Sequence, residues 1–380
     1  MKSGIYGLVL VVNLISIFFS INLLLYRKHA SRYGKKKERC NQITSYEEDK
    51  TLCPLHPENI HGREPLNRSI FTLEALQTTY DYMDHGHFRP VTCIPRQKVA
   101  IIIPYRDREK GLFTLLNNVV PRIRRQHIEF GIYVVEQIAG ELFNKGVCFN
   151  VGFEQAMTEY NYDCVVLHDV DIIAENDRNF FSCGYYPKHL AVNVEQYGYK
   201  LPYKYYIGGI TNMASNVYRQ INGFSNQYEG WGLEDDDLYR RLTVVHNLDI
   251  ERPPAKVSFC GSVNHSRKHK WNKNRLLDRC NIYINRPRGW AFDGLSTLKY
   301  QVEKIEDRKL YKWILISFRT SKMRQEFVER FRIEDYKNLQ PVNAVFNGNT
   351  KTCYWALKKA NKTIDQSLVD IVQKSKKSSR

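Results

Sequence analysis

Acidic residues are in deficit along this chain, with 40 Asp and Glu against 57 Lys and Arg among 380 residues, a formal net charge of +17. The positive surplus is concentrated in two segments: residues 27–39 hold seven Lys or Arg and one Glu, and residues 371–380 hold four and no acid. A nucleic-acid binder needs its basic residues clustered on a folded face, and little surplus remains for one. Composition therefore argues against a nucleic-acid partner.

The nine cysteines include no Cys-x-x-Cys pair, so a structural zinc site is not expected. Disulfides are the better use for so many cysteines, and they form in oxidising compartments such as the secretory lumen. Three Asn-x-Ser/Thr sequons, at Asn67, Asn264 and Asn361, agree with that location. Asn264 adjoins a candidate metal ligand that a glycan would obstruct, so we expect glycans at Asn67 and Asn361.

Formal charge is absent from residues 5–26, and these 22 residues at 1.5 Å each are long enough to span a hydrocarbon core of about 30 Å. We predict a transmembrane signal anchor there, after a cytoplasmic tail of residues 1–4. A cleaved signal peptide is the alternative, but no small-residue cleavage site follows. The basic flank after the helix conflicts with the positive-inside rule, whereas the cysteines and sequons favour a lumenal carboxyl-terminal part.

Residues 27–92 are polar and interrupted by prolines, which is typical of a stem, and we expect the catalytic domain to span residues 93–318. Within it, residues 99–105 read as a strand, residues 112–119 show helical apolar spacing, and residues 131–135 read as a second strand. This is a βαβ unit and predicts an α/β fold. Residues 319–380 form a carboxyl-terminal extension with a basic tail, whose role the sequence does not reveal.

Two acidic clusters carry the candidate chemistry. Asp169 and Asp171 directly follow an apolar strand, at the strand end where α/β sheets bind ligands, and alternation along a strand can point both carboxylates to one side. Hard carboxylate oxygens suit a divalent cation that neutralises a nucleotide diphosphate. An exposed acidic turn is the alternative interpretation.

The second cluster is the run of four acids at residues 234–237, which would repel one another unless a nearby group needs them. Glycines flank Trp231 just before the run, which predicts a loop with an aromatic face suited to a sugar ring. Residues 238–242 follow the acidic run as the start of a helix, whose dipole favours acids at its amino terminus. One of these carboxylates can deprotonate an acceptor hydroxyl.

Taken together, these stretches resemble the β-1,4-galactosyltransferase family in motif identity, order and spacing. The resemblance runs from about residue 53 to residue 318. It is carried by VAIIIPYRDR at 99–108, FNK at 143–145, NVGF at 150–153, DVD at 169–171, LPY at 201–203, GG at 208–209, INGF at 221–224, GWGLEDDD at 230–237 and HSR at 265–267.

The resemblance implies a GT-A fold, one catalytic domain with a mixed central sheet. It also implies manganese, a UDP-sugar donor, a terminal GlcNAc or related acceptor on a glycoprotein or glycolipid, inversion at the anomeric carbon, and type II anchoring in the Golgi membrane. By the same resemblance, the catalytic base is Asp235, and the metal ligands are Asp171 and His265. The implied donor-binding set is Pro104, Tyr105, Arg106, Arg108, Phe143, Lys145, Val170, Asp171, Tyr206, Trp231 and Glu234. The implied acceptor-binding set is Tyr203, Trp231, Asp235 and Asp236, and the implied disulfides are Cys53–Cys93 and Cys164–Cys183.

Three positions depart from the family pattern. Lys145 replaces an arginine, so a point charge substitutes for a bidentate fork. Ser262 stands where a methionine usually completes the metal site, and its harder oxygen makes Mg²⁺ an alternative to Mn²⁺. Glu229 stands where the acceptor loop usually carries another tryptophan.

The donor sugar is read from Tyr206, which in this family crowds out an acetamido group and so favours galactose. The alternatives are an N-acetylgalactosaminyl- or N-acetylglucosaminyltransferase on the same scaffold. A non-catalytic carbohydrate-binding relative is a further alternative.

Overall fold

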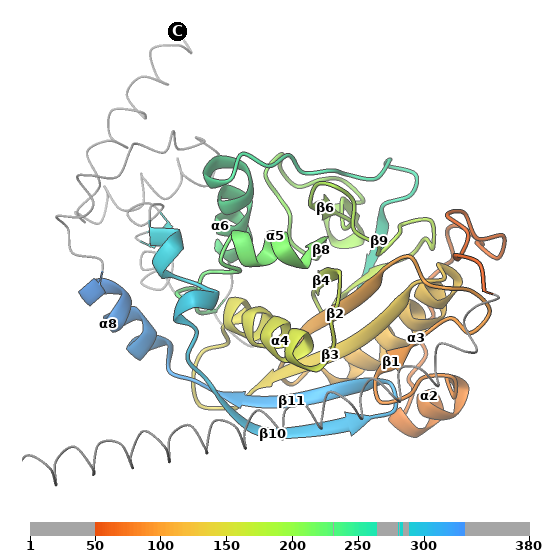
Figure 1. The fold of residues 1–380 in the computed structure, drawn as a ribbon, viewed down its shortest axis with the longest axis horizontal. Coiled ribbons are helices and arrows are strands. Elements are labelled where there is room, and N and C mark those ends of the chain that lie inside the picture. The colour runs from red at the N-terminus through yellow and green to blue at the C-terminus, as the bar shows by residue number, and fades with distance from the viewer. Residues whose placement is uncertain (1–49, 231, 264–279, 281, 284–288, 331–380) are drawn as a thin grey trace, which may run out of the picture. The chain divides into compact units, whose positions relative to one another are not determined.

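The computed structural model describes residues 50–230, 232–263, 280, 282–283 and 289–330 (Figure 1). The expected anchor at 5–26 lies outside these residues, as do Trp231, Asn264, His265 and Asn361. No helix in the described part of the chain is long and apolar enough to cross a membrane.

The chain divides into two compact units, residues 1–52 with 92–94, and residues 53–91 with 95–380. Among the described residues of the first unit, Leu52 and Ile94 form a parallel bridge. The helices and strands described below belong to the second unit.

A mixed sheet forms the centre of the second unit, in the order β10-β11-β3-β2-β4-β8-β6, with β1 pairing β3. Strands β11, β3, β2 and β4 run parallel, while β10, β8 and β6 are antiparallel to their neighbours and β1 to β3. The bounds are β1 His87–Phe88, β2 Lys98–Tyr105, β3 Glu129–Gln137, β4 Cys164–His168, β6 Lys188–His189, β8 Ile210–Ala214, β10 Gln301–Arg308 and β11 Tyr311–Ser317.

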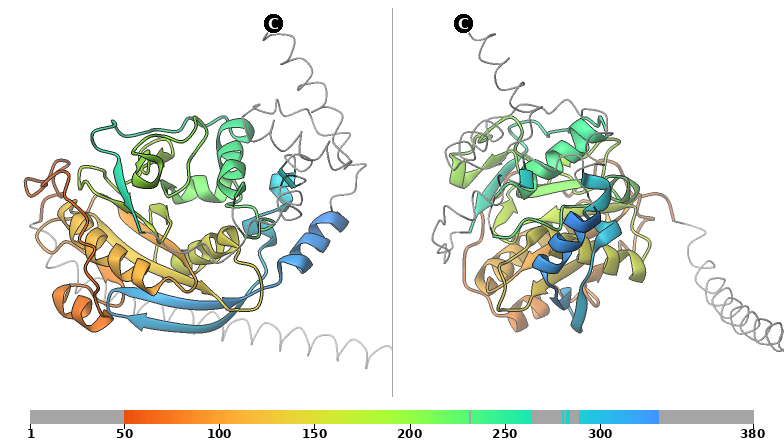
Figure 2. Two further views of the ribbon diagram at one scale, coloured as in Figure 1. Left: turned by 180° about the vertical axis from the view of Figure 1, so that it is seen from behind. Right: turned by 90° about the vertical axis from the view of Figure 1, so that its left-hand side faces the viewer.

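Both faces of this sheet are covered, because β2 and β3 are apolar on both sides. Alternate residues of β2 enter two separate apolar clusters, Val99, Ile101 and Ile103 on one face and Ala100 and Ile102 on the other. Helices α2 (Leu73–Thr79) and α3 (Glu109–Arg125) cover the first face, and α4 (Lys145–Glu159) covers the second (Figures 1 and 2). The predicted βαβ unit is confirmed as β2-α3-β3.

The remaining elements follow the central strands in sequence and pack around them. A small sheet pairs β9 (Phe259–Ser262) antiparallel with β5 (Ile172–Ala174) and parallel with β7 (Asn193–Val194). Helices α5 (Ser215–Gln220), α6 (Glu234–Arg240) and α8 (Thr320–Arg330) contribute to the α4 side, and a π-helix at Arg241–Val245 continues α6. Short 3-10 helices occur at Glu195–Tyr197, Gly289–Phe292 and Leu295–Thr297.

The packed unit begins earlier than the expected boundary at residue 93. Leu76 of α2 is fully buried in the α3-side cluster, and Tyr80 and Met83 are buried beside it. Glu64 pairs with Arg125 of α3 at 2.5 Å. Part of the segment expected to be a stem is therefore packed, since its prolines lie outside α2 and do not prevent the burial of apolar side chains.

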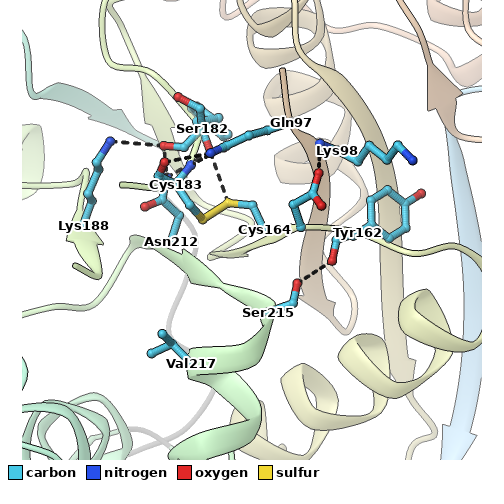
Figure 3. The surroundings of a disulfide bond; sticks show 12 residues. Gln97, Lys98, Tyr162, Cys164, Ser182, Cys183, Lys188, Asn212, Ser215 and Val217 are labelled. Carbon is cyan, nitrogen blue, oxygen red and sulfur yellow. Dashed lines mark hydrogen bonds between the residues drawn. A yellow bond between two sulfur atoms is a disulfide. The ribbon is translucent and has the colours of Figure 1, made fainter. Parts of the chain in front are cut away.

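A disulfide joins Cys164, at the first residue of β4, to Cys183, as the resemblance implied (Figure 3). The Gln97 side chain accepts from the Cys183 amide at 2.8 Å and donates to its carbonyl at 3.1 Å, and Asn212 of β8 donates to the Ser182 carbonyl. Cys53, Cys93 and Cys280 are disulfide-bonded as well, while Cys148 and Cys260 are buried free thiols. The Cys164–Cys183 bond thus fastens a loop to the amino-terminal end of β4, opposite the end that carries Asp169.

Removing this crosslink should lower stability without altering the acidic end of β4. For a closed loop of this size, chain entropy predicts a loss of about 3 kcal/mol for Cys164→Ala with Cys183→Ala. Urea unfolding measures it, and Cys260→Ala controls for the loss of a buried sulfur. Equal stability of the double variant and the wild type would show that the bond is dispensable.

Candidate functional site

The candidate site lies where the parallel strands β2, β3 and β4 end, the edge at which open α/β sheets bind ligands. Tyr105 ends β2, and Arg106 lies with its guanidinium 5.2 Å from the ring centre of Phe143, which follows β3. Arg106 also donates to the Glu141 carbonyl at 2.8 Å. Arg108 precedes α3 and donates to the Asp107 carbonyl. A basic and aromatic group therefore forms at the ends of β2 and β3.

Lys145 joins the two acidic clusters that the sequence singled out. Its ammonium lies 2.9 Å from both carboxylate oxygens of Asp235, 3.0 Å from Glu234 and 3.5 Å from Asp169. Asn144 caps the amino terminus of α4 by accepting from the Val147 amide, which fixes the start of the helix that carries Lys145. The two acidic clusters thus meet through Lys145, at Asp169 and Asp235.

Burial sets the protonation of this group. It raises the pKa of the Asp235 carboxyl to about 7 and that of Asp169 to about 6, with Lys145 opposing the rise and the neighbouring acids adding to it. Burial also acts against the charge on Lys145, but Asp169, Asp235 and Glu234 outweigh it and hold the pKa of the ammonium well above its usual value. A carboxyl with a pKa near neutrality is suited to proton transfer.

Each acid of the 234–237 run has a partner of its own, which explains why four like charges are tolerated. Glu234 accepts from the Gly232 amide at 2.9 Å, in addition to its contact with Lys145. Asp236 accepts from the Tyr203 hydroxyl at 3.4 Å, and Asp237 accepts from Arg241 at 2.9 Å. The carboxylates of residues 234–237 are therefore held by hydrogen bonds and ion pairs, unlike those of an exposed acidic loop.

Tyr206 lies in an aromatic group beside Asp235. Its ring makes edge contacts with His189, Tyr197 and Tyr203 at centroid distances of 5.4 to 5.7 Å. Gly208 lies between Tyr206 and Asp235. A Cβ added at residue 208 would lie 2.6 Å from an Asp235 carboxylate oxygen and 3.0 Å from the Tyr206 ring. The missing side chain at residue 208 is what lets Asp235 approach.

Of the two expected metal ligands, Asp171 belongs to the described residues. The Val263 amide donates to the Asp171 carbonyl at 2.9 Å, and Ile172 pairs with Ser262 in the β5–β9 ladder. His265 lies two residues beyond Val263, outside the described residues. Hard carboxylate oxygens at Asp171 and Asp169 fit Mn²⁺ or Mg²⁺. The Ser262 hydroxyl lies 3.4 Å from a Glu195 carboxylate oxygen. Arg68 donates both to that Glu195 oxygen and to the Ser262 carbonyl.

A separate cluster of His61, Glu64 and Asp177 has ligand-like spacing. However, Asp177 already accepts from the His61 and Gly62 amides and from Arg125. These donors satisfy the carboxylate, so the cluster is a structural ion-pair network.

The described residues place most of the predicted set at one edge of the sheet. Pro104 and Tyr105 end β2, Val170 is buried between the two acids of the DVD motif, and Tyr203 is half exposed above Asp236. Asn67 is exposed, as a glycan acceptor must be. Trp231 and His265 are not among the described residues.

Sequence reasoning missed one supporting residue, Asp293. Its buried carboxylate accepts from the Ser225 hydroxyl at 2.5 Å and the Asn226 amide at 2.9 Å, and pairs with Arg241 at 3.3 Å. It thereby fixes the start of the loop that leads to Trp231. No motif surrounds Asp293, and only the apolar neighbours Ala291 and Phe292 could have suggested burial.

Comparison with known proteins now decides the family. A family model described as the N-terminal region of glycosyl transferase group 7 matches residues 53–184, and one described as the N-terminal domain of galactosyltransferase matches residues 188–267. β-1,4-Galactosyltransferase 4 of Cricetulus griseus is 37% identical over 291 residues, covering 76% of this chain and 83% of that protein. The chain belongs to the β-1,4-galactosyltransferase family. The predicted resemblance is thus confirmed.

Further relatives agree. β-1,4-Galactosyltransferase 5 of Danio rerio is 37% identical over 265 residues, covering 68% of each chain. Among solved structures, the catalytic domain of Drosophila β-1,4-galactosyltransferase 7 with xylobiose matches with a TM-score of 0.50 and 25% identity, over 60% of this chain and 98% of that one. A mutant of the same enzyme, solved with manganese, UDP-Gal and xylobiose, matches equally. The predicted GT-A-like α/β fold with a mixed sheet is confirmed.

Gly208→Ala should displace Asp235 while leaving the fold intact. A misplacement of about 1 Å can lower a rate roughly 100-fold, so we expect at least that loss of sugar transfer with a nearly unchanged melting temperature. Gly111→Ala is the control, because a Cβ there would meet the Val170 carbonyl at an ordinary 3.6 Å. Full transfer by Gly208→Ala would mean that Asp235 need not lie where the structure has it.

Proposed function

We propose that this protein is an inverting, metal-dependent β-1,4-galactosyltransferase that moves galactose from UDP-galactose to the 4-hydroxyl of a terminal GlcNAc or related sugar. The observation that carries the proposal is the buried carboxylate of Asp235, held beside Lys145, Glu234 and Asp169 at the carboxyl end of the sheet. Family membership supports the reaction class. The structural relative solved with manganese and UDP-Gal supports the donor and the metal.

The chain's own residues divide the work as follows. Asp235, with a pKa near 7, takes the proton of the acceptor hydroxyl, whose oxygen then attacks the anomeric carbon in a single displacement. Tyr203 and Asp236, which share a hydrogen bond, orient the acceptor together with Trp231. Arg106 and Phe143, whose guanidinium and ring lie 5.2 Å apart, together contact the uridine, and Arg108 faces the leaving phosphates.

The metal in this proposal is Mn²⁺, with Mg²⁺ as the alternative, held by Asp171 and His265. When bound, it neutralises charge that develops on the departing diphosphate. The acids near Asp171 favour a cation, because Lys145 is the one cation that the described contacts place among three carboxylates. The Val263–Asp171 hydrogen bond supports His265 as the second ligand, since Val263 precedes His265 by two residues in the sequence.

The donor is proposed to be UDP-galactose because Tyr206 is held rigidly by three aromatic rings next to Asp235. A fixed aromatic wall leaves no room for an acetamido group, a discrimination worth about 1–3 kcal/mol. We also propose type II anchoring in the Golgi membrane through residues 5–26, a Cys53–Cys93 disulfide, and glycans at Asn67 and Asn361.

The decisive experiment offers UDP-galactose, UDP-GalNAc and UDP-GlcNAc to the purified protein with manganese and GlcNAc as acceptor. We expect galactose transfer to dominate, and Asp235→Asn to bind donor without turnover. Asp249→Asn, at an exposed aspartate, is the matched control. Transfer of an N-acetylhexosamine would support the rival enzyme. Failure to transfer any of the three sugars would leave a carbohydrate-binding relative.

The pH dependence follows from the pKa of Asp235. The carboxylate is the active form, so kcat should rise with pH through about 7 and level off above it. Lys145 lowers that pKa, so Lys145→Met should move the rising limb to higher pH and reduce the plateau. An initial-rate pH profile of both proteins measures this, and a limb that stays in place after the substitution would contradict the assignment.

A further inference from the structure

Helix α8 begins the carboxyl-terminal extension and is packed onto the catalytic unit. Thr320 is fully buried, and Met323 is 4% exposed within the apolar cluster that also holds Phe149 and Phe224. Lys299 pairs with Glu326 at 2.5 Å on the outer side of the helix. The helix begins the segment 319–380 that the sequence analysis expects to be an extension, and burial and charge fix it to the catalytic unit.

The same helix contacts both walls of the candidate site. The side-chain amide of Asn144 donates a hydrogen bond to the buried Thr320 hydroxyl at 3.3 Å. Asn144 is the residue that caps α4 immediately before Lys145. On the other wall, Arg324 donates to the Gln227 carbonyl at 2.8 Å and lies 3.4 Å from the Glu229 carboxylate. One short helix therefore touches the bases of the two segments that carry Lys145 and Asp235.

Glu229 occupies a sensitive position in this arrangement. It precedes Gly230, Gly232 and Leu233, which have φ of 76°, 106° and 76°. These three are the described residues between Glu229 and α6, and all have left-handed backbone conformations. Such a turn does not hold itself in place. The Gly230 amide donates to the Phe143 carbonyl at 2.7 Å, and Arg324 supplies the contact before it.

The Glu229 carboxylate lies 3.4 Å from the guanidinium of Arg324 on this helix. Arg324 and Glu229 are 32% and 20% exposed, so their ion pair adds little to global stability, and its effect is to fix the loop.

We propose that Arg324 is a positioning residue for sugar transfer, holding the loop before Trp231 and Asp235 through Gln227 and Glu229, and that this is the role of the first turns of the extension. The expected change in acceptor KM rests on the proposed function, whereas the positioning of the loop by Arg324 does not. The loop that Arg324 holds is the one assigned to the acceptor, so the consequence concerns acceptor use rather than donor binding.

The test compares Arg324→Gln, Glu229→Gln and the double variant in the full chain. Lys322→Gln removes the same charge from an exposed position of the same helix and is the control. We expect each single variant to raise the acceptor KM roughly three- to tenfold, the size typical of losing one ordinary hydrogen bond, because the pair is partly exposed, with the donor KM unchanged. The double variant should be no worse than the more impaired single one, because both remove one interaction.

Amide hydrogen exchange over residues 226–236 gives a readout that does not require activity. Exchange should rise in Arg324→Gln and Glu229→Gln and stay at the wild-type level in Lys322→Gln. If the wild type transfers no sugar, the proposed function fails while this measurement still decides the positioning role. Unchanged exchange in both variants, or additive KM effects in the double variant, would overturn it.

Discussion

The candidate site depends on one ammonium group shared among three carboxylates. Without Lys145, the acids at the end of β4 and at the start of α6 would repel one another across a poorly solvated gap, and neither segment could approach the other. The pairing is also incomplete, because one positive charge cannot neutralise Asp169, Glu234 and Asp235 together. The raised pKa values of Asp169 and Asp235 express that shortfall. A divalent cation and a positively charged transition state are what such a site can still accept.

This arrangement makes the free energy of unfolding depend on pH. A carboxyl whose pKa is higher in the folded chain than its ordinary value stabilises the fold below that ordinary value and loses the contribution as pH rises through the folded pKa. For Asp235 the window runs from its ordinary value of 3.8 to about 7. Asp235 therefore works against the fold at neutral pH, whereas the raised pKa of Lys145 works in its favour there. The surrounding network of Asp237, Arg241 and Asp293 carries satisfied, buried ion pairs that hold α6 in place despite it.

How far the sequence predicted this molecule follows from what each signal encodes. Strand β2, helix α3 and strand β4 were predictable because apolar periodicity reports burial directly. The DVD motif and the 234–237 acids were predictable because their spacing is set by chemistry within a few residues. Asp293 and Arg324 were not, since each acts on a loop about 70 to 100 residues away and neither sits in a motif. The packing of the segment before residue 93 was not predicted, although Leu76, Tyr80 and Met83 recur at helical spacing and are buried, because the polar, proline-interrupted composition around them is typical of a stem.

The loop between Phe224 and α6 shows how a strained turn can carry precise chemistry. Its beginning is rigid, because Asn226 bonds Asp293 on one side and Asn150 and Asn144, both of α4 and its cap, on the other. Its end is rigid, because Asp237 is held by Arg241 and Tyr228. Between them, Gly232 and Leu233 take left-handed conformations, and for a leucine that conformation costs about 1–3 kcal/mol. Strain of that kind persists only where both ends are overdetermined, so the contacts of Asp293, and of Arg324 at Gln227, are what allow Asp235 to be held beside Lys145.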